Sequence, residues 1–429
     1  MKKRNIFFVV LFFATAVYKA QPKPDSLNIT LPQAEKIFSE KNLQLIAAKY
    51  NISASKAAEI QSGLWSNPTF SIEQNIYNKE TRKYFDFTQN GNTDFAIDQL
   101  IVLGGKRSKQ VSLAQLNSKM VENNYYDLLR NLEFQLRTDF YKLFFYRQSL
   151  IFYNETIPVL KSTINISESG YEKKLILLSE LIRLKSLLLS LENEKLDLIT
   201  KIEDTENELC LFFQVNPETK PVILPVLNSN FISDSEFRNL PLDTAIQTAK
   251  ENRPDLQNSK LSVEYEKMNL SLQKAMAVPD ITIGGRYSRN GNYIPDYTAL
   301  AIQIDLPFFN RNQGNIEVSE MNLESKKQNE LNSEIGAVSD VVSAYNKALQ
   351  TDRLFNNYDK NFSGQYKSLL EGITLNYQRR NITTIEFTDF LESYRNTMVQ
   401  INQLYLDRLS SFEELNLAVG KIILNTSLR

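Results

Sequence analysis

The strongest constraint on the fold is an internal repeat, because the second half of the chain copies the first. Four pairs of segments carry the similarity, in the same order in both copies: 31–45 with 241–256, 67–72 with 278–283, 97–105 with 304–314, and 171–181 with 377–387. A copy of roughly 200 residues is far longer than the repeat unit of a solenoid. The sequence therefore predicts one tandem duplication of a whole structural unit.

Each copy predicts a helix, a pair of strands and then a long helical hairpin. In the first copy, apolar residues spaced three and four apart between Ala34 and Ala48 indicate a helix of about 35 residues. Phe70 and Ile72 then alternate with polar neighbours, which is typical of a strand with one apolar face. A polar loop separates this strand from a second one, and each is expected to have about ten residues.

The hairpin that follows is unusually long. Between Lys106 and Gly170 the only proline is Pro158, and apolar residues recur at helical spacing. A rod of about 60 residues extends roughly 90 Å, and the proline is expected to bend it. The remaining long helices are expected over about residues 175–213, 315–376 and 383–419.

The first twenty residues have the features of a secretory signal peptide. They begin with Lys2, Lys3 and Arg4, continue with a short apolar run and end in small residues. Cleavage is expected after Ala20, with Ala16 as the alternative. The chain is thus divided into a signal peptide (1–20), a first repeat (21–213), a linker (214–240) and a second repeat (241–429). No second apolar run is long enough for a membrane helix, so any membrane crossing requires β-strands.

Composition excludes most catalytic chemistry. The chain has no histidine and a single cysteine, Cys210. A Ser-His-Asp or Cys-His catalytic site, a zinc or copper cage of His and Cys, and an internal disulfide are therefore impossible, whereas carboxylate chemistry is not excluded. Because nucleophile and phosphate-loop motifs are also absent, we expect no enzyme activity, no cofactor and no resident metal. The chain has no interleaved basic and aromatic patch that would indicate nucleic-acid binding.

The strands suit a membrane better than a soluble domain. Their alternation gives one apolar and one polar face, and aromatic residues lie near their ends: Trp65, Phe70, Tyr77, Tyr287, Tyr297, Phe308 and Phe309. Four strands cannot close a barrel, which needs about eight. Three chains would supply twelve strands, so we expect a homotrimer in contact with lipid. Soluble hairpins packed on a helix bundle are the alternative interpretation.

Two phrases resemble a known family. DLPFFNRNQGNI, residues 305–316, and QLIVLGGKR, residues 99–107, are similar to the TolC-type outer membrane efflux family and to its metal-cation efflux (CzcC/CusC-like) subgroup. The resemblance covers essentially the whole mature chain. It implies a mainly α protein with a small β part, in which long helical hairpins form a periplasmic α-barrel and four strands per chain contribute to a trimeric twelve-stranded outer membrane β-barrel.

The same resemblance implies a function. The chain would be a passive duct in the cell outer membrane, with a long periplasmic extension, that receives heavy-metal cations from an inner-membrane RND-type pump through a periplasmic adaptor protein. A drug or toxic-compound duct and a type I secretion duct of the same family are alternatives. A periplasmic coiled-coil scaffold or adaptor is a further one, although its lipoyl-like domain would need more than the 13 glycines present.

The resemblance also places a gate at the turn of the second hairpin. Tyr377 matches a tyrosine near the family's tip glycine, and Glu386 and Asp389 match two acids on the next helix. The acids are i, i+3 neighbours on one helix face, and three copies would form rings that attract cations. The tip glycine is replaced by Arg380-Asn381, and we expect Asn381 to take the left-handed turn conformation. An ordinary solvated acidic pair is the alternative.

A second candidate region is the corner between the strands and the long helices. Gly104 and Gly105 in the first copy and Gly314 in the second are expected to allow the change of direction. Phe308 and Phe309 are expected to end the strand at the membrane–water interface. Two further residues, Asp98 and Asp305, hold equivalent places in the copies and would either line the lumen or act as solubilising acids near turns.

Overall fold

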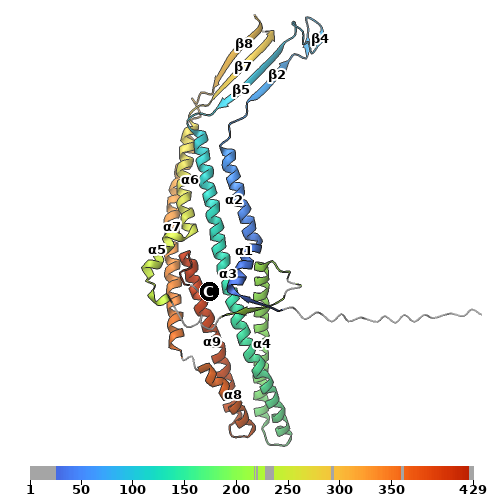
Figure 1. Ribbon diagram of the computed structural model, residues 1–429, viewed down its shortest axis with the longest axis vertical. Coiled ribbons are helices and arrows are strands. Elements are labelled where there is room, and N and C mark those ends of the chain that lie inside the picture. Colours follow the sequence, from blue (N-terminus) through green and yellow to red (C-terminus); the bar gives the residue numbers. More distant parts are fainter. Residues whose placement is uncertain are drawn as a thin grey trace, which may run out of the picture.

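The computed structural model describes residues 26–216, 218, 221–227, 236–290, 294–358 and 362–424. The expected signal peptide, residues 1–20, and much of the expected linker lie outside these described residues. The molecule is elongated, with a β-sheet at one end and the turns of two helical hairpins at the other (Figure 1). Among the described residues, none of the helices is both long and apolar enough to cross a membrane.

The first helix of each copy is broken where the sequence predicted one continuous helix. In the first copy α1 (Leu31–Lys41) is followed by α2 (Leu43–Ser62), and in the second α5 (Leu242–Asn252) is followed by α6 (Pro254–Met276). Asn42 has an extended backbone, and its side chain caps α2 by accepting from the amides of Gln44 and Leu45 at 3.0 and 3.1 Å. Arg253 is extended because the residue before a proline disfavours the helical conformation.

The long hairpins follow the prediction in the first copy and depart from it in the second. α3 (Lys106–Glu172) is continuous, and α4 (Leu178–Phe213) returns beside it. The single rod expected over 315–376 is wrong, because α7 (Gln313–Asn357) ends before α8 (Phe362–Gln378) begins. Tyr358 leaves the helical conformation, and its hydroxyl group lies 3.0 Å from that of Tyr405 on α9 (Thr384–Val419). The break between α7 and α8 is therefore held against α9 by this pair of tyrosines.

The strands of both copies join in one antiparallel sheet. Its order is β2 (Thr69–Gln74), β5 (Thr93–Ile101), β7 (Ile281–Asn290) and β8 (Pro295–Ile304). β5 of the first copy pairs with β7 of the second, so the two copies share one continuous sheet. β2 is shorter than predicted, because the chain beyond it forms a small separate hairpin of β3 (Tyr77–Asn78) and β4 (Lys83–Tyr84). β2 and β8 remain the two edges of the sheet.

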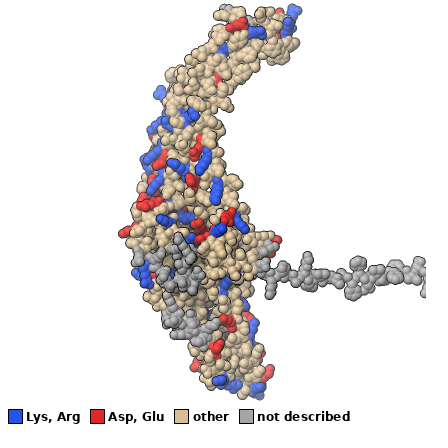
Figure 2. Space-filling model, in the orientation of Figure 1, with Lys and Arg blue, Asp and Glu red and all other residues tan. Residues whose placement is uncertain are grey.

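One face of this sheet is apolar and open. The register aligns the following side chains across it: Phe70, Ile72, Phe95, Ile97, Ile283, Tyr287, Leu300 and Ile302. The rings of Phe70, Phe95 and Tyr287 form a row with centroids 6.4 and 6.2 Å apart. Leu300 is 73% exposed and Ile302 62%, so no part of the described chain covers them. Figure 2 shows few charged residues between the two ends of the sheet region on the face in view.

The opposite face is polar and carries an ion pair. Asp98 on β5 lies 3.2 Å from Arg286 on β7. Gly284 stands directly opposite Asp98 in the register, and a Cβ atom there would lie 2.0 Å from the Asp98 carboxylate. Because Gly284 has no side chain, the Asp98 carboxylate fits over this position and reaches Arg286.

Short elements that flank the long helices pack around the middle of the molecule. β1 (Ser26–Thr30) and β6 (Val222–Val226) pair in parallel beside α3, and a short 3-10 helix, η3 (Glu236–Asn239), precedes α5. β6 lies within the expected linker, so that part of it is an ordered strand. One buried ion pair joins the copies, because Arg137 of α3 contacts Glu413 of α9 at 3.2 Å. A second one lies within the second copy, where Arg408 of α9 contacts Asp352 of α7 at 2.9 Å.

We predict that Gly284→Ala destabilises the sheet, because the added methyl group overlaps the Asp98 carboxylate. Overpacking of this kind typically costs about 1–3 kcal/mol. The matched control is Gly285→Ala on the same strand, where the nearest atom would lie at 3.7 Å. Thermal unfolding of the detergent-purified protein, followed by circular dichroism, should show a lower midpoint for the first variant only. Equal midpoints would contradict this account of Gly284.

Candidate functional site: the hairpin turns and the corner below the sheet

The two hairpin turns close in the same way. The amide of Leu175 donates to the Gly170 carbonyl at 2.8 Å, and the amide of Asn381 donates to the Asn376 carbonyl at 2.8 Å. In each turn the residue before this amide is left-handed, with φ of 59° at Lys174 and 60° at Arg380. The hairpin therefore survives without a tip glycine. The expectation that Asn381 is the left-handed residue is wrong, because the hydrogen-bond pattern requires that conformation one residue earlier.

Tyr377 packs inside its own hairpin. Its ring is stacked on that of Phe387 with centroids 4.6 Å apart, and its hydroxyl group lies 3.1 Å from the Thr384 hydroxyl. The matching residue of the first copy, Tyr171, is 41% exposed instead. The structure thus places Tyr377 between α8 and α9, where it fastens the two helices together.

Glu386 caps the helix that follows. Its carboxylate accepts from the Thr383 amide at 2.7 Å and from the Thr383 hydroxyl at 3.0 Å, while its own amide donates to that hydroxyl at 3.2 Å. These hydrogen bonds from Thr383 lower the pKa of Glu386. The T-x-x-E spacing is the known signature of a capping box, so the sequence did contain this signal. Asp389 is exposed one turn further along, on the same side as Glu386.

The acidic pair is specific to the second hairpin. The matching positions of the first hairpin hold Glu180 and Arg183, both on α4. Glu180 is also a helix-capping residue, since its carboxylate accepts from the Leu177 amide at 3.4 Å. The capping function is therefore shared by the two copies, whereas the second negative charge at Asp389 is not.

A polar bridge that sequence reasoning missed joins the two hairpins above their turns. The Glu194 carboxylate on α4 accepts from Arg395 on α9 at 2.9 Å and from the Tyr153 hydroxyl on α3 at 3.0 Å. Burial and the negative charge of Glu194 raise the pKa of Tyr153. No local pattern indicates this bridge, because its partners are about 200 residues apart in the sequence.

The corner of the first copy is built around two glycines. Gly104 and Gly105 both have left-handed backbones, with φ of 69° and 68°. The buried side chain of Lys106 then donates to the Val278 carbonyl and to the Asp280 carboxylate, each at 2.7 Å. This lysine clamps the first corner to the turn between α6 and β7, which belongs to the second copy.

The corner of the second copy uses an asparagine. Asn312 has φ of 60° and occupies the position before α7, and its side-chain amide donates to the Gln273 carbonyl at 2.8 Å. Gly314 already lies in the first turn of α7, and nothing would touch an added Cβ there. The expectation that Gly314 makes the turn is therefore wrong. Phe308 and Phe309 precede the helix and are 69% and 96% exposed.

The two candidate lumen acids are not equivalent. Asp98 lies within β5 and is paired with Arg286. Asp305 follows the last residue of β8 and is exposed. The sequence repeat gave the two acids equivalent positions, whereas the sheet register gives them different ones.

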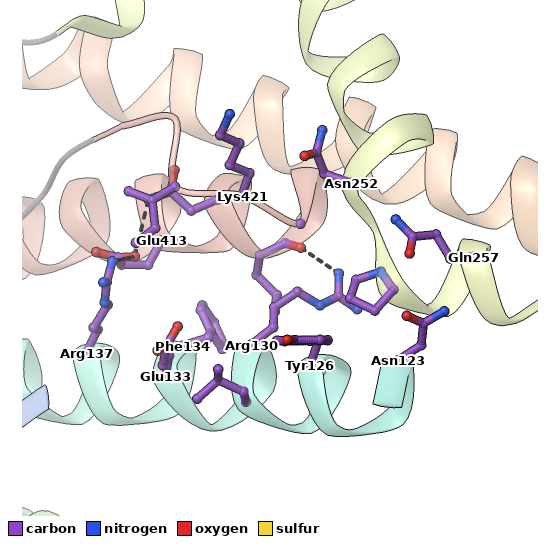
Figure 3. Close-up of a pocket in the computed structure, with 16 residues that line it drawn as sticks. Asn123, Tyr126, Arg130, Glu133, Phe134, Arg137, Asn252, Gln257, Glu413 and Lys421 are labelled. Carbon is purple, nitrogen blue, oxygen red and sulfur yellow. Dashed lines mark hydrogen bonds and ion pairs between the residues drawn. The ribbon is translucent and has the colours of Figure 1, made fainter. Parts of the chain in front are cut away.

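A cavity of about 360 Å³ lies in the middle of the molecule, between α3, the start of α6 and the end of α9 (Figure 3). Arg130 reaches across it to the Leu417 carbonyl at 2.9 Å, and Arg137 reaches Glu413. Burial raises the pKa of Glu133, which lines the same space. The sequence did not indicate this cavity. Within the part of the chain that the structure describes, no group of three or more acidic or cysteine side chains is arranged to hold a metal ion.

Comparisons with known proteins agree with this architecture. Residues 245–421 match the family model described as Outer membrane efflux protein. No curated protein sequence matches the chain. The family model thus matches most of the second copy, and the metal-cation subgroup stays a prediction.

Solved structures extend the likeness to nearly the whole chain. The crystal structure of CusC has a TM-score of 0.73 at 15% identity and covers 91% of this chain and 92% of its own. The CmeC outer membrane channel of Campylobacter jejuni has a TM-score of 0.73 at 16% identity, with 92% and 87% covered. The outer-membrane channel OprN has a TM-score of 0.71 at 12% identity, with 91% and 89% covered. The chain therefore has the fold of these channels, mainly helical with a small β part.

We predict that the capping box at Thr383 stabilises the second hairpin independently of charge. Thr383→Ala should lower the free energy of unfolding by about 1 kcal/mol, as expected for a lost N-cap. Glu386→Ala should also destabilise, whereas Glu386→Gln should not, because glutamine keeps the acceptor oxygen. Asp389→Ala is the control and should be neutral. If thermal unfolding shows equal losses for the Gln and Ala variants, the charge of Glu386 matters rather than its cap.

Proposed function

We propose that the chain is the outer membrane component of an efflux system and acts as a passive duct. The observation that carries this proposal is the four-stranded sheet, which has an exposed apolar face and two edges that no other described strand pairs with. Such a sheet is unstable in water alone and unsatisfied in lipid unless its edges are paired. Three copies, with β8 of each chain beside β2 of the next, would form a closed twelve-stranded barrel. Its polar face, with Asp98 and Arg286, would then line a water-filled lumen.

The long helical hairpins support the proposed periplasmic part of the duct. Three copies of α3, α4, α7, α8 and α9 would continue the barrel into a periplasmic tunnel. The glycine corner at 104–105 and the aromatic pair Phe308–Phe309 would lie at the inner membrane interface, where aromatic side chains are favoured. The hairpin turns would face a periplasmic adaptor and an inner-membrane RND-type pump, which supplies the energy. The basic and apolar N-terminus supports export of the chain from the cytoplasm.

The second hairpin is the proposed gate. Threefold symmetry would bring Glu386 and Asp389 into stacked rings at the end of the tunnel, with Tyr377 holding α8 against α9 behind them. The carboxylates attract cations more strongly in a narrow opening than in bulk water. Glu386 and Asp389 are both exposed in the single chain, so they are free to face the threefold axis of the proposed trimer.

The gate is tested by charge-neutral substitutions that keep the fold. Glu386→Gln combined with Asp389→Asn retains the capping oxygen and removes both charges. In single-channel recordings this variant should show at least about tenfold weaker block by divalent or trivalent cations, most clearly at low salt. The control is Glu203→Gln with Asp204→Asn, exposed acids on α4. Equal block in the gate variant and the parent would show that the constriction lies elsewhere.

We propose heavy-metal cations as the cargo, on the basis of the DLPFFNRNQGNI segment and its resemblance to the metal-cation subgroup. Deleting the gene should increase sensitivity to toxic metal cations, and the intact gene should restore resistance. If only sensitivity to drugs or bile salts changes, the cargo assignment is wrong while the duct proposal stands. No change in either would argue for a secretion duct or a scaffold.

A further inference from the structure

The small hairpin beyond β2 is a feature of the first copy alone. Between β2 and β5 the chain makes an excursion that contains β3 and β4, whereas β7 and β8 are separated only by residues 291–294. Figure 1 places β4 at the far end of the sheet, away from the helices and on the side of β2. We call residues 77–92 the distal loop. The proposed function does not require it, since a short turn would connect the strands.

A buried carboxylate gives the distal loop a fixed shape. Asp86 is 3% exposed, and its carboxylate accepts from the Thr88 amide at 3.0 Å, the Thr88 hydroxyl at 2.6 Å, the Thr81 hydroxyl at 2.5 Å and the Asn78 amide at 3.3 Å. A buried charge is tolerated only when it is satisfied in this way. Hydrogen bonds from Thr81 and then Thr88 lower the pKa of Asp86 to about 2. Its stabilising contribution is therefore lost only as the pH falls toward that value.

The ordered loop presents aromatic side chains outward. Tyr84, Phe85 and Phe87 are 72%, 55% and 62% exposed and follow one another closely in the sequence. Arg289 of β7 donates to the Phe87 carbonyl at 2.6 Å, so this part of the loop is tied to the sheet. Aromatic side chains of this kind favour the boundary between lipid and water.

Basic side chains lie among these aromatics. Lys79, Arg82 and Lys83 are all exposed, and Arg82 is held in a left-handed turn with φ of 55°. The distal loop contains only two acids, Glu80 and Asp86, and the second is buried and fully hydrogen-bonded. The surface of the loop is therefore net positive and aromatic, next to the apolar face of the sheet.

We propose that the distal loop docks onto the phosphate groups of anionic lipids in the outer leaflet of the membrane around the barrel. Tyr84, Phe85 and Phe87 would enter the interfacial zone, and Lys79, Arg82 and Lys83 would pair with phosphate oxygens. Both contacts follow from known preferences, since basic residues bind anionic lipid surfaces and aromatic rings bind the interface. The inference rests on the proposed function, because it requires the sheet to lie in a membrane.

The test uses the full mature chain in detergent and native mass spectrometry. The probe is a bis-phosphorylated lipid A, compared with the same glycolipid after enzymatic removal of its phosphates. The parent should bind the phosphorylated form at least about tenfold more tightly, and Lys79→Gln/Arg82→Gln/Lys83→Gln should lose that preference. The control Lys56→Gln/Lys173→Gln/Arg379→Gln removes the same charge from exposed positions on the helical part and should keep it.

Three outcomes would overturn the proposal: equal binding of the two lipids by the parent, an unchanged preference in the distal-loop variant, or complete displacement of the lipid by millimolar inorganic phosphate. The last would indicate a site for a free anion rather than for a lipid. Conductance in planar bilayers separates this test from the proposed function. A distal-loop variant that still conducts leaves the duct intact, whereas a parent that never conducts argues against the duct itself.

Discussion

The sheet with two open edges is the constraint on which the rest of this molecule depends. Among the residues that the structure describes, no strand pairs with the outer edges of β2 and β8, and none covers the apolar face between them. In lipid each unpaired group costs several kcal/mol, so a single chain cannot remain there alone. In the proposed trimer, pairing with neighbouring copies would satisfy the edges, leave the apolar face to lipid, and turn the polar face toward an enclosed space. The proposal therefore makes assembly a requirement of a stable sheet.

In the proposed trimer, the helical part would follow the symmetry of the sheet. The corner at Gly104 and Gly105 is locked to the second copy by Lys106 and Asp280, so the two copies leave the sheet as one unit. Further down, Glu194 joins α4 to α9 through Arg395. Because these contacts are made within one chain, the hairpins of the second copy would reach the threefold axis of the proposed trimer in an orientation set by the first. The acids of the proposed gate depend on that orientation.

Much of this architecture is readable from the sequence, because its signals are local. The lack of proline and glycine in α3, apart from Pro158, predicts a continuous rod, and alternation predicts the strands. The breaks at Asn42 and Arg253 also have local signals, an asparagine cap and a following proline, which the helical periodicity outweighed. The capping box at Glu386 was readable for the same reason.

The features that escaped prediction arise from contacts between distant segments. The polar segment 356–364, NNYDKNFSG, is a local sign of a break, but it does not show that the Tyr358 hydroxyl packs against Tyr405 on another helix. The bridge from Glu194 to Arg395 and the different surroundings of Asp98 and Asp305 depend on the assembled hairpins and the sheet register. Periodicity describes single elements, whereas these features are properties of the packed chain.

Cross-linking of the two sheet edges tests the central claim most directly. In a Cys210→Ala background, which removes the only native thiol, one cysteine is placed at Ser71 on β2 and another at Ala299, Ala301 or Gln303 on β8. A disulfide forms only when the Cα atoms approach within about 7 Å. The closed trimer predicts that at least one pair, oxidised in membranes, gives covalent dimers and trimers on a non-reducing gel, while each single cysteine gives none. Only monomers from every pair would contradict the account.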